Sequence, residues 1–208
     1  MKPLLVFLAV GLALPFLANG QTNSLPSTMN SGQTVETIVC IRHGEKPKGG
    51  LGQLSCRGLN RALALPNVLL KKYGSPQFVF APNPTQKVDA GGYYYVRPIA
   101  TIEPTAIRCG LPVDTEFGYK EIKGLETELQ KSKYQSAIVF VAWEHVLLDD
   151  FVKGEVKSYG GDPAHVPDWP TDDYDTIFVL KITRDAAGSS IAFSIDHEHL
   201  NGLSDDCP

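Results

Sequence analysis

The chain has 208 residues, 43% of them hydrophobic and 20% charged, and its net charge at neutral pH is −4. This length and composition are typical of one globular domain with a sizeable core. The negative charge gives no electrostatic reason to expect nucleic acid or an anionic membrane as a partner.

The first 20 residues have the pattern of a secretory signal peptide. Lys2 is followed by the apolar run Leu4 to Leu17 and then by small residues at 18–20. The run is too short to span a membrane, and no second candidate follows it. We therefore expect a signal peptide over residues 1–20, a flexible lead-in over 21–34, a catalytic domain over 35–208, and a secreted or periplasmic protein.

Four cysteines remain after such a cleavage, in a compartment that permits disulfides. Their spacings match no zinc pattern, and four cysteines allow three pairings. Cys40 lies within an apolar run and is interpreted as a core residue. If one bond forms, we expect it between two of the other three, which are Cys56, Cys109 and Cys207.

The first element of the domain is the β-branched run Thr37 to Ile41, which predicts a buried strand. Gly44 marks where the backbone leaves the sheet, so Arg42 and His43 lie at the carboxyl end of the strand, where ligands bind in open α/β sheets. A cation beside an imidazole disfavours the protonated ring and keeps His43 neutral. This pair suits attack on a phosphate; the alternative is an incidental surface pair.

The middle of the chain alternates between helical and strand patterns. Leu59, Leu63 and Leu70 repeat at helical spacing before Gly74, with Pro66 expected to kink the helix. A short buried strand is predicted at 78–80. A helix should then start at Arg97, where the following proline suits a first turn, and run to about residue 108. A polar helix is expected around 120–131.

The last third of the domain begins with the apolar run 137–141, which predicts a buried strand that delivers Glu144 and His145 at its carboxyl end. A helix to about residue 152 follows it. Runs at 176–182 and 190–195, joined by a turn at Ala187-Gly188, predict an antiparallel edge hairpin. The alternation of strands and helices predicts an α/β three-layer sandwich with a mostly parallel central sheet.

Four elements together resemble the histidine phosphatase superfamily, which has the phosphoglycerate mutase-like fold. They are Arg42-His43-Gly44, the helix start over residues 54–62, Arg97, and His145 after a later strand. The resemblance runs from about residue 35 to 182, in the family's order and spacing. The short gaps between the motifs leave no room for a large helical cap, so the chain resembles the compact, capless branch.

The resemblance implies that His43 is the nucleophile and forms a phosphohistidine. It also implies that Arg42, Arg97 and His145 bind the phosphoryl oxygens. Phosphoryl transfer places charge on the equatorial oxygens, so fixed positive donors stabilise the transition state, and guanidinium groups match phosphate geometry. No metal and no cofactor are called for.

The proton donor is open between Glu121 and Glu144, which we weight equally. Glu121 lies nearest to the position that the mutase-like branch uses, and Glu144 adjoins His145. Glu116 is a weaker candidate. Cap-bearing relatives place an Asp after the second His, but Val146 stands there.

Other polar residues have simpler interpretations. Glu45 is expected to orient a neighbouring ring or Arg. Arg57 and Arg61, one helical turn apart, should be solvated or ion-paired, although Arg57 could reach a substrate. The tyrosines at 93–95 either wall the pocket or pack. The run 197–199 offers two imidazoles but lacks a third metal ligand.

The sequence thus predicts an exported phosphatase that hydrolyses a phosphomonoester through phosphohistidine on His43. The expected substrate is a phosphorylated small molecule or surface component of unknown identity. The alternatives are a mutase or phosphotransferase with the same nucleophile, or a non-catalytic module that binds a phosphorylated ligand. The oligomeric state cannot be predicted.

Overall fold

The computed structural model describes residues 32–88 and 91–208, so the expected signal peptide and most of the lead-in lie outside the described residues. A mixed five-stranded sheet in the order β2-β5-β1-β6-β7 forms its centre. The strands are β1 (Thr34–Arg42), β2 (Phe78–Phe80), β5 (Ile138–Trp143), β6 (Thr176–Asp185) and β7 (Gly188–His197). Strands β2, β5 and β1 pair in parallel, whereas β6 pairs antiparallel with both β1 and β7. Four of these five strands therefore run in one direction, and the antiparallel hairpin lies at an edge, as predicted.

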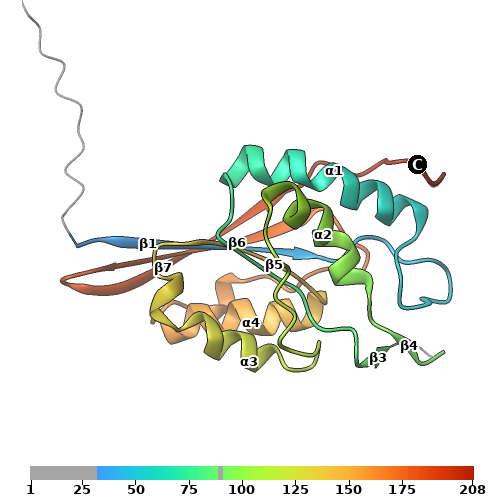
Figure 1. The fold of residues 1–208 in the computed structure, drawn as a ribbon. Coiled ribbons are helices and arrows are strands. Elements are labelled where there is room, and N and C mark those ends of the chain that lie inside the picture. The colour runs from blue at the N-terminus through green and yellow to red at the C-terminus, as the bar shows by residue number, and fades with distance from the viewer. Residues whose placement is uncertain (1–31, 89–90) are drawn as a thin grey trace, which may run out of the picture. The chain divides into compact units, whose positions relative to one another are not determined.

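Helices cover both faces of the sheet (Figure 1). Helices α1 (Cys56–Tyr73) and α2 (Arg97–Cys109) lie on one face, and α3 (Ile122–Leu129) and α4 (His145–Ser158) on the other. Two short 3-10 helices, η1 (Ser132–Tyr134) and η2 (Pro163–His165), follow α3 and α4. The described part of the chain is thus the expected three-layer sandwich. None of its helices is both long and apolar enough to cross a bilayer.

The two faces of the sheet have separate apolar cores. Val39 and Ile41 of β1 pack with Leu65 and Leu69 of α1 on one face, while residues that alternate with them pack against α3 and α4 on the other. This is the period-2 alternation of a strand that is buried on both sides.

The buried face of α1 differs from the one that the leucine spacing suggested. Ala62, Leu65 and Leu69 are buried, whereas Leu59 and Leu63 are exposed. The helix continues through Pro66, so this proline does not end it. The Ser55 hydroxyl starts the helix by accepting a hydrogen bond from the Gly58 N–H at 3.1 Å.

Several element bounds also differ from the prediction. Helix α4 continues six residues past Val152 to Ser158, and α3 is shorter than expected. A small hairpin of β3 (Lys87–Val88) and β4 (Tyr93–Tyr94) was not predicted. Strand β1 begins at Thr34, one residue before the expected start of the domain.

A disulfide joins Cys56 at the start of α1 to Cys207, which confirms the expected choice among three cysteines. Cys40 is free and buried, and Cys109 is free. Residues 199–208, the C-terminal strap, are also fixed to α1 by polar contacts. Arg57 forms an ion pair with Asp205 at 2.7 Å, and the Asn60 amide donates to the carbonyl oxygens of Ser204 and Asp206.

Candidate active site

The parallel pairing of β1 and β5 brings the two predicted histidines to one edge of the sheet. Arg42 lies opposite Trp143 in the register, and the His43 N–H donates a hydrogen bond to the Trp143 carbonyl at 3.0 Å. His145, two residues after Trp143, is the first residue of α4. The carboxyl ends of adjacent strands therefore bring the predicted site residues together, at the edge where ligands bind in open α/β sheets.

His43 is held as a neutral imidazole. Its side chain is buried, and Nδ1 lies 2.7 Å from the Gly44 carbonyl oxygen, so Nδ1 carries the proton and donates it. Burial, together with the charges of Arg97 and Arg42, lowers the pKa of His43 to about 3 against the opposing Gly44 hydrogen bond. Nε2 therefore keeps a lone pair at neutral pH, which is the state that a nucleophile needs.

Arg42 is fixed by the loop before β6. Its Nη1 donates to the carbonyl oxygens of Thr171 at 2.7 Å and Asp173 at 2.8 Å. The guanidinium carbon lies 4.0 Å from the centre of the Tyr174 ring, a cation–π distance. Carbonyl acceptors orient this guanidinium without neutralising its charge.

Arg97 approaches His43 from α2. Its side chain is buried, its backbone N–H donates to the Gly52 carbonyl at 3.1 Å, and its guanidinium carbon lies 4.8 Å from the centre of the Tyr95 ring. The Thr101 hydroxyl, one turn later in α2, accepts the Gly44 N–H at 2.8 Å and donates to the Arg97 carbonyl at 2.8 Å. Thr101 thus ties the helix that carries Arg97 to the loop that carries His43.

The loop that follows His43 and contains Glu45 also packs tightly on α1, where Gly58 is required. A Cβ on Gly58 would lie 2.4 Å from the Glu45 carbonyl oxygen and 2.9 Å from its nitrogen. Because these are backbone atoms, a larger residue would displace the loop that holds His43.

Glu144 and His145 form a pair at the start of α4. Glu144 caps the helix, with Oε2 accepting the Leu147 N–H at 3.0 Å, and its Oε1 lies 2.6 Å from Nδ1 of His145. Burial acts to raise the Glu144 pKa, but the contact with His145 and the capping hydrogen bonds outweigh it and hold this pKa below its usual value. Glu144 is therefore a carboxylate at neutral pH and orients the His145 ring.

The two other candidate acids lie on the surface before α3. Glu121 is exposed, and its Oε2 accepts the Gly118 N–H at 2.6 Å. Glu116 is exposed as well, and its N–H donates to Asp114. Within the described residues, neither carboxylate has a hydrogen bond or ion pair to His43 or Arg42. The choice of proton donor stays a prediction.

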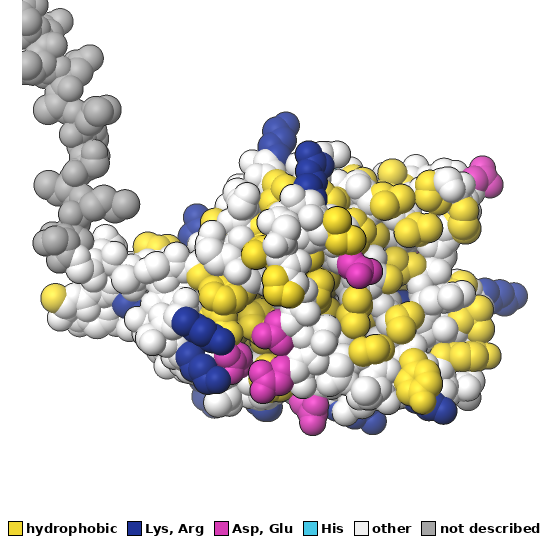
Figure 2. Space-filling view, in the orientation of Figure 1, with side chains coloured by type: hydrophobic (Ala, Val, Ile, Leu, Met, Phe, Trp, Pro, Cys, Tyr) yellow, Lys and Arg dark blue, Asp and Glu magenta, His cyan; other side chains and the backbone are white. Residues whose placement is uncertain are grey.

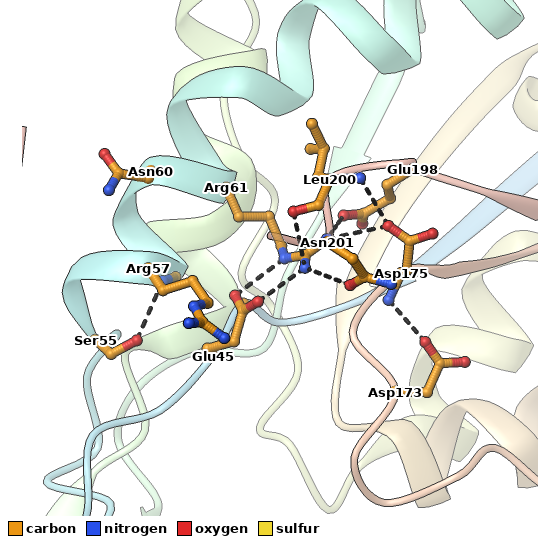
Figure 3. Close-up of polar contacts among 12 residues, drawn as sticks. Glu45, Ser55, Arg57, Asn60, Arg61, Asp173, Asp175, Glu198, Leu200 and Asn201 are labelled. Atoms are coloured by element: carbon orange, nitrogen blue, oxygen red, sulfur yellow. Dashed lines mark hydrogen bonds and ion pairs between the residues drawn. The ribbon is translucent and has the colours of Figure 1, made fainter. Parts of the chain in front are cut away.

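Arg61 is the centre of a buried ionic cluster behind the nucleophile loop (Figure 3). Its side chain is fully buried and forms a bidentate pair with Glu45, at 3.0 Å from Nε and 2.8 Å from Nη2. Nη1 binds Glu198 and lies 3.6 Å from Asp175. Arg61 was expected to be solvated or ion-paired, and it is ion-paired and buried. Glu45 was expected to orient a neighbouring ring or Arg, and it pairs with Arg61. Glu198 serves this cluster, and no group of three or more His, Cys, Asp or Glu in the described ranges could hold a metal.

Three site residues were missed or left undecided in the sequence. Tyr95 is buried against His43 and Arg97, although the tyrosine run left packing and pocket wall as equal alternatives. Thr101 could have been found, because a residue four positions after Arg97 shares its helix face. Tyr174 lies in a polar loop that carries no periodic signal.

Comparisons with known proteins agree with this geometry at the level of the fold. No family model and no curated protein matches the sequence. Among solved structures, a phosphoglycerate mutase from Plasmodium falciparum superposes with a TM-score of 0.52 at 13% identity, over 82% of this chain and 97% of that one. A mycobacterial glucosyl-3-phosphoglycerate phosphatase gives 0.50 at 14% identity, over 77% and 97%. A putative alpha-ribazole-5'-P phosphatase from Escherichia coli gives 0.50 at 12% identity, over 83% and 98%.

Proposed function

We propose that this chain, which has the phosphoglycerate mutase-like fold of the histidine phosphatases, is an exported phosphatase that hydrolyses a phosphomonoester through a phosphohistidine on His43. The observation that carries the proposal is the state of His43. It is a buried, neutral imidazole whose Nδ1 is held by a carbonyl, and the charges of two buried guanidinium groups act on it.

The reaction follows from this arrangement in two displacements. In the first, the Nε2 lone pair of His43 attacks phosphorus, the bond to the ester oxygen breaks, and that oxygen takes a proton and leaves as an alcohol. In the second, water attacks phosphorus, loses a proton to a base, and releases inorganic phosphate while His43 recovers its lone pair. Arg42, Arg97 and His145 bind the equatorial oxygens in both steps, where fixed donors lower the barrier most.

The acid and the base are to be sought at Glu144 and Glu121. Glu144 acts electrostatically on His43 and is ionised at neutral pH, which suits the proton-accepting role in the second step. Glu121 is exposed and would need a bound substrate that places the leaving oxygen next to its carboxyl group. A donor in the first step and an acceptor in the second are separable by experiment, because loss of the donor slows phosphoenzyme formation and loss of the acceptor slows its breakdown.

The test is phosphate release by residues 21–208 on a panel of sugar phosphates, other phosphorylated metabolites and phosphoproteins, at pH 4 to 8. His43→Ala should abolish release, while His165→Ala, which removes an exposed imidazole of η2, should leave it unchanged. A rapid-quench experiment with Glu121→Gln and Glu144→Gln should show which one slows formation of an acid-labile phosphoenzyme. Full activity of His43→Ala would refute the proposal.

Two other outcomes would identify the alternatives. Transfer of the phosphoryl group to an acceptor other than water would indicate a mutase or phosphotransferase. Binding of phosphorylated ligands without turnover across the panel would indicate a binding module.

Export is supported by the Cys56–Cys207 disulfide, which requires an oxidising compartment to persist. It is tested by expressing the full chain in a bacterial host and sequencing the N-terminus of the protein from the periplasm and medium. Cleavage next to residue 20 is expected, and a full-length chain retained in the cytoplasm would contradict export.

A further inference from the structure

Tyr95 occupies the wall of the site between the nucleophile and the arginine of α2. It lies two residues before Arg97, and its side chain is only 1% exposed. Its ring meets His43 edge-on at 5.7 Å between centroids and Tyr119 at 5.1 Å. Contacts on several sides hold the ring in one orientation.

The hydroxyl group of Tyr95 is the unusual part. Its oxygen is buried and forms no hydrogen bond of normal geometry with the described residues, although the Arg97 guanidinium is close enough to act on this oxygen as a donor and oppose the rise in its pKa. The hydroxyl proton itself has no acceptor among the described residues. Buried polar groups are nearly always hydrogen-bonded, and an unsatisfied one costs about 1–3 kcal/mol. We therefore expect a bound ligand to supply the acceptor for this hydroxyl group.

The charges around this hydroxyl identify the chemistry of the partner. The three that act on it are Arg97, Glu144 and Arg42, the same three that act on His43. Burial raises the pKa of the Tyr95 phenol, although Arg97 opposes this, so the group keeps its proton and is a hydrogen-bond donor. A neutral donor close to two guanidinium groups fits an anion with several acceptor oxygens.

We infer that the Tyr95 hydroxyl donates a hydrogen bond to an oxygen of the phosphoryl group, making Tyr95 a phosphate-binding residue of the active site. The inference rests on the proposed function, and it adds a neutral donor to the charged set of Arg42, Arg97 and His145. Because Tyr119 and His43 already fix the ring, little side-chain entropy is lost when the bond forms.

The residues next to Tyr95 differ from it in exposure. Leu51, Tyr93 and Tyr94 next to it are exposed at 42%, 42% and 57%. Figure 2 shows hydrophobic side chains at the surface where the β3–β4 hairpin lies. Tyr95 alone among these tyrosines is turned inward, which separates its role from that of the outer pair.

The experiment compares Tyr95→Phe with wild type and with Tyr134→Phe. Tyr134 is a matched control, because it is equally buried but lies in the opposite core, where its hydroxyl donates to Glu128 at 2.8 Å. The measurements are the dissociation constants of inorganic phosphate and vanadate by calorimetry, kcat/KM for phosphate release, and the thermal midpoint.

A hydrogen bond to a charged acceptor corresponds to roughly a tenfold to hundredfold effect. Tyr95→Phe should weaken phosphate and vanadate binding and lower kcat/KM by that factor, with an unchanged or higher thermal midpoint. Tyr134→Phe should lower the midpoint and leave binding and turnover unchanged. A lower midpoint for Tyr95→Phe with phosphate affinity unchanged would overturn the inference, because it would show that the hydroxyl is structural.

Failure of this inference is distinguishable from failure of the proposed function. If wild type binds phosphate and vanadate but hydrolyses nothing, the phosphatase proposal fails, and the loss of anion affinity in Tyr95→Phe still supports the inference. If wild type turns over and Tyr95→Phe matches it in every measurement, the function stands and the inference fails.

Discussion

Replacement of Arg61 by Met should destabilise the fold strongly and in a pH-dependent way. The substitution keeps an unbranched apolar stem but removes the cation that Glu45, Glu198 and Asp175 share. Removing one partner of a buried ion pair typically costs about 3–5 kcal/mol, because it leaves charge buried without compensation. That is a large part of the ~5–15 kcal/mol that stabilises an ordinary domain.

The pH dependence follows from Glu198. Burial, together with the charges of Asp175 and Glu45, raises the pKa of this carboxyl to about 8 against the opposing charge of Arg61. Since the ordinary value is 4.5, the folded protein holds a proton between about pH 4.5 and 8 that the unfolded chain releases. Stability therefore falls as pH rises through this window. Without Arg61 the pKa of Glu198 rises further, so the deficit of the variant should grow above about pH 8, where wild type releases this proton and the variant keeps it.

Urea unfolding of wild type, Arg61→Met and Arg57→Met at about pH 6 and about pH 9.5, on either side of the Glu198 pKa, measures this. Arg57 is the control, because its pair with Asp205 is solvent-exposed and such pairs contribute less than about 1 kcal/mol. We expect Arg61→Met to lose about 3–5 kcal/mol at pH 9.5 and less at pH 6. A loss below ~1 kcal/mol at pH 9.5, or one that is equal at both pH values, would refute this account of the cluster.

Three further predictions concern the site and the disulfide. Because the pKa of His43 is lowered to about 3, its ring should stay unprotonated in mild acid. A pH profile of kcat/KM should therefore show no loss of activity from protonation of His43 near pH 6.5. A titration near that pH that disappears only when His43 is changed would contradict this. Thr101→Val should lower kcat/KM about fivefold by releasing the Gly44 N–H, and Thr101→Ser should restore it; equal activity of both variants would speak against the link. Cys207→Ser should lower the unfolding free energy by about 2–5 kcal/mol in urea, whereas Cys109→Ser should not, and equal midpoints for these two would exclude a stabilising bond.

The sequence predicted the parts of the fold that local patterns govern. Strand β2 was predicted to the residue, because Phe78 to Phe80 is an uninterrupted apolar run between turn signals. Arg42 and His43 were placed at a strand end for the same reason. Helix α4 was cut short because Lys153, Gly154 and neighbouring charges look like a helix end, although Glu155 and Val156 are buried in the fold.

What the sequence could not give depends on contacts between distant segments. Arg61 looks like a surface residue from its helix spacing, and its burial depends on carboxylates at positions 45, 175 and 198 that the fold assembles. The sequence also could not decide the proton donor. Glu121 and Glu144 differ mainly in burial and in their contacts, which depend on the folded structure. Tyr95 became a site residue only when its ring was placed against His43.

The disulfide closes a covalent loop from the start of α1 to the end of the chain, because Cys56 and Cys207 are 151 positions apart. A protease that cuts one surface loop anywhere between them leaves two fragments joined by a covalent bond. The nicked molecule would keep its mass on a non-reducing gel and would separate into fragments only with a thiol. Under the proposed export, a single cut by a peptidase between these two cysteines would not release a piece of the fold.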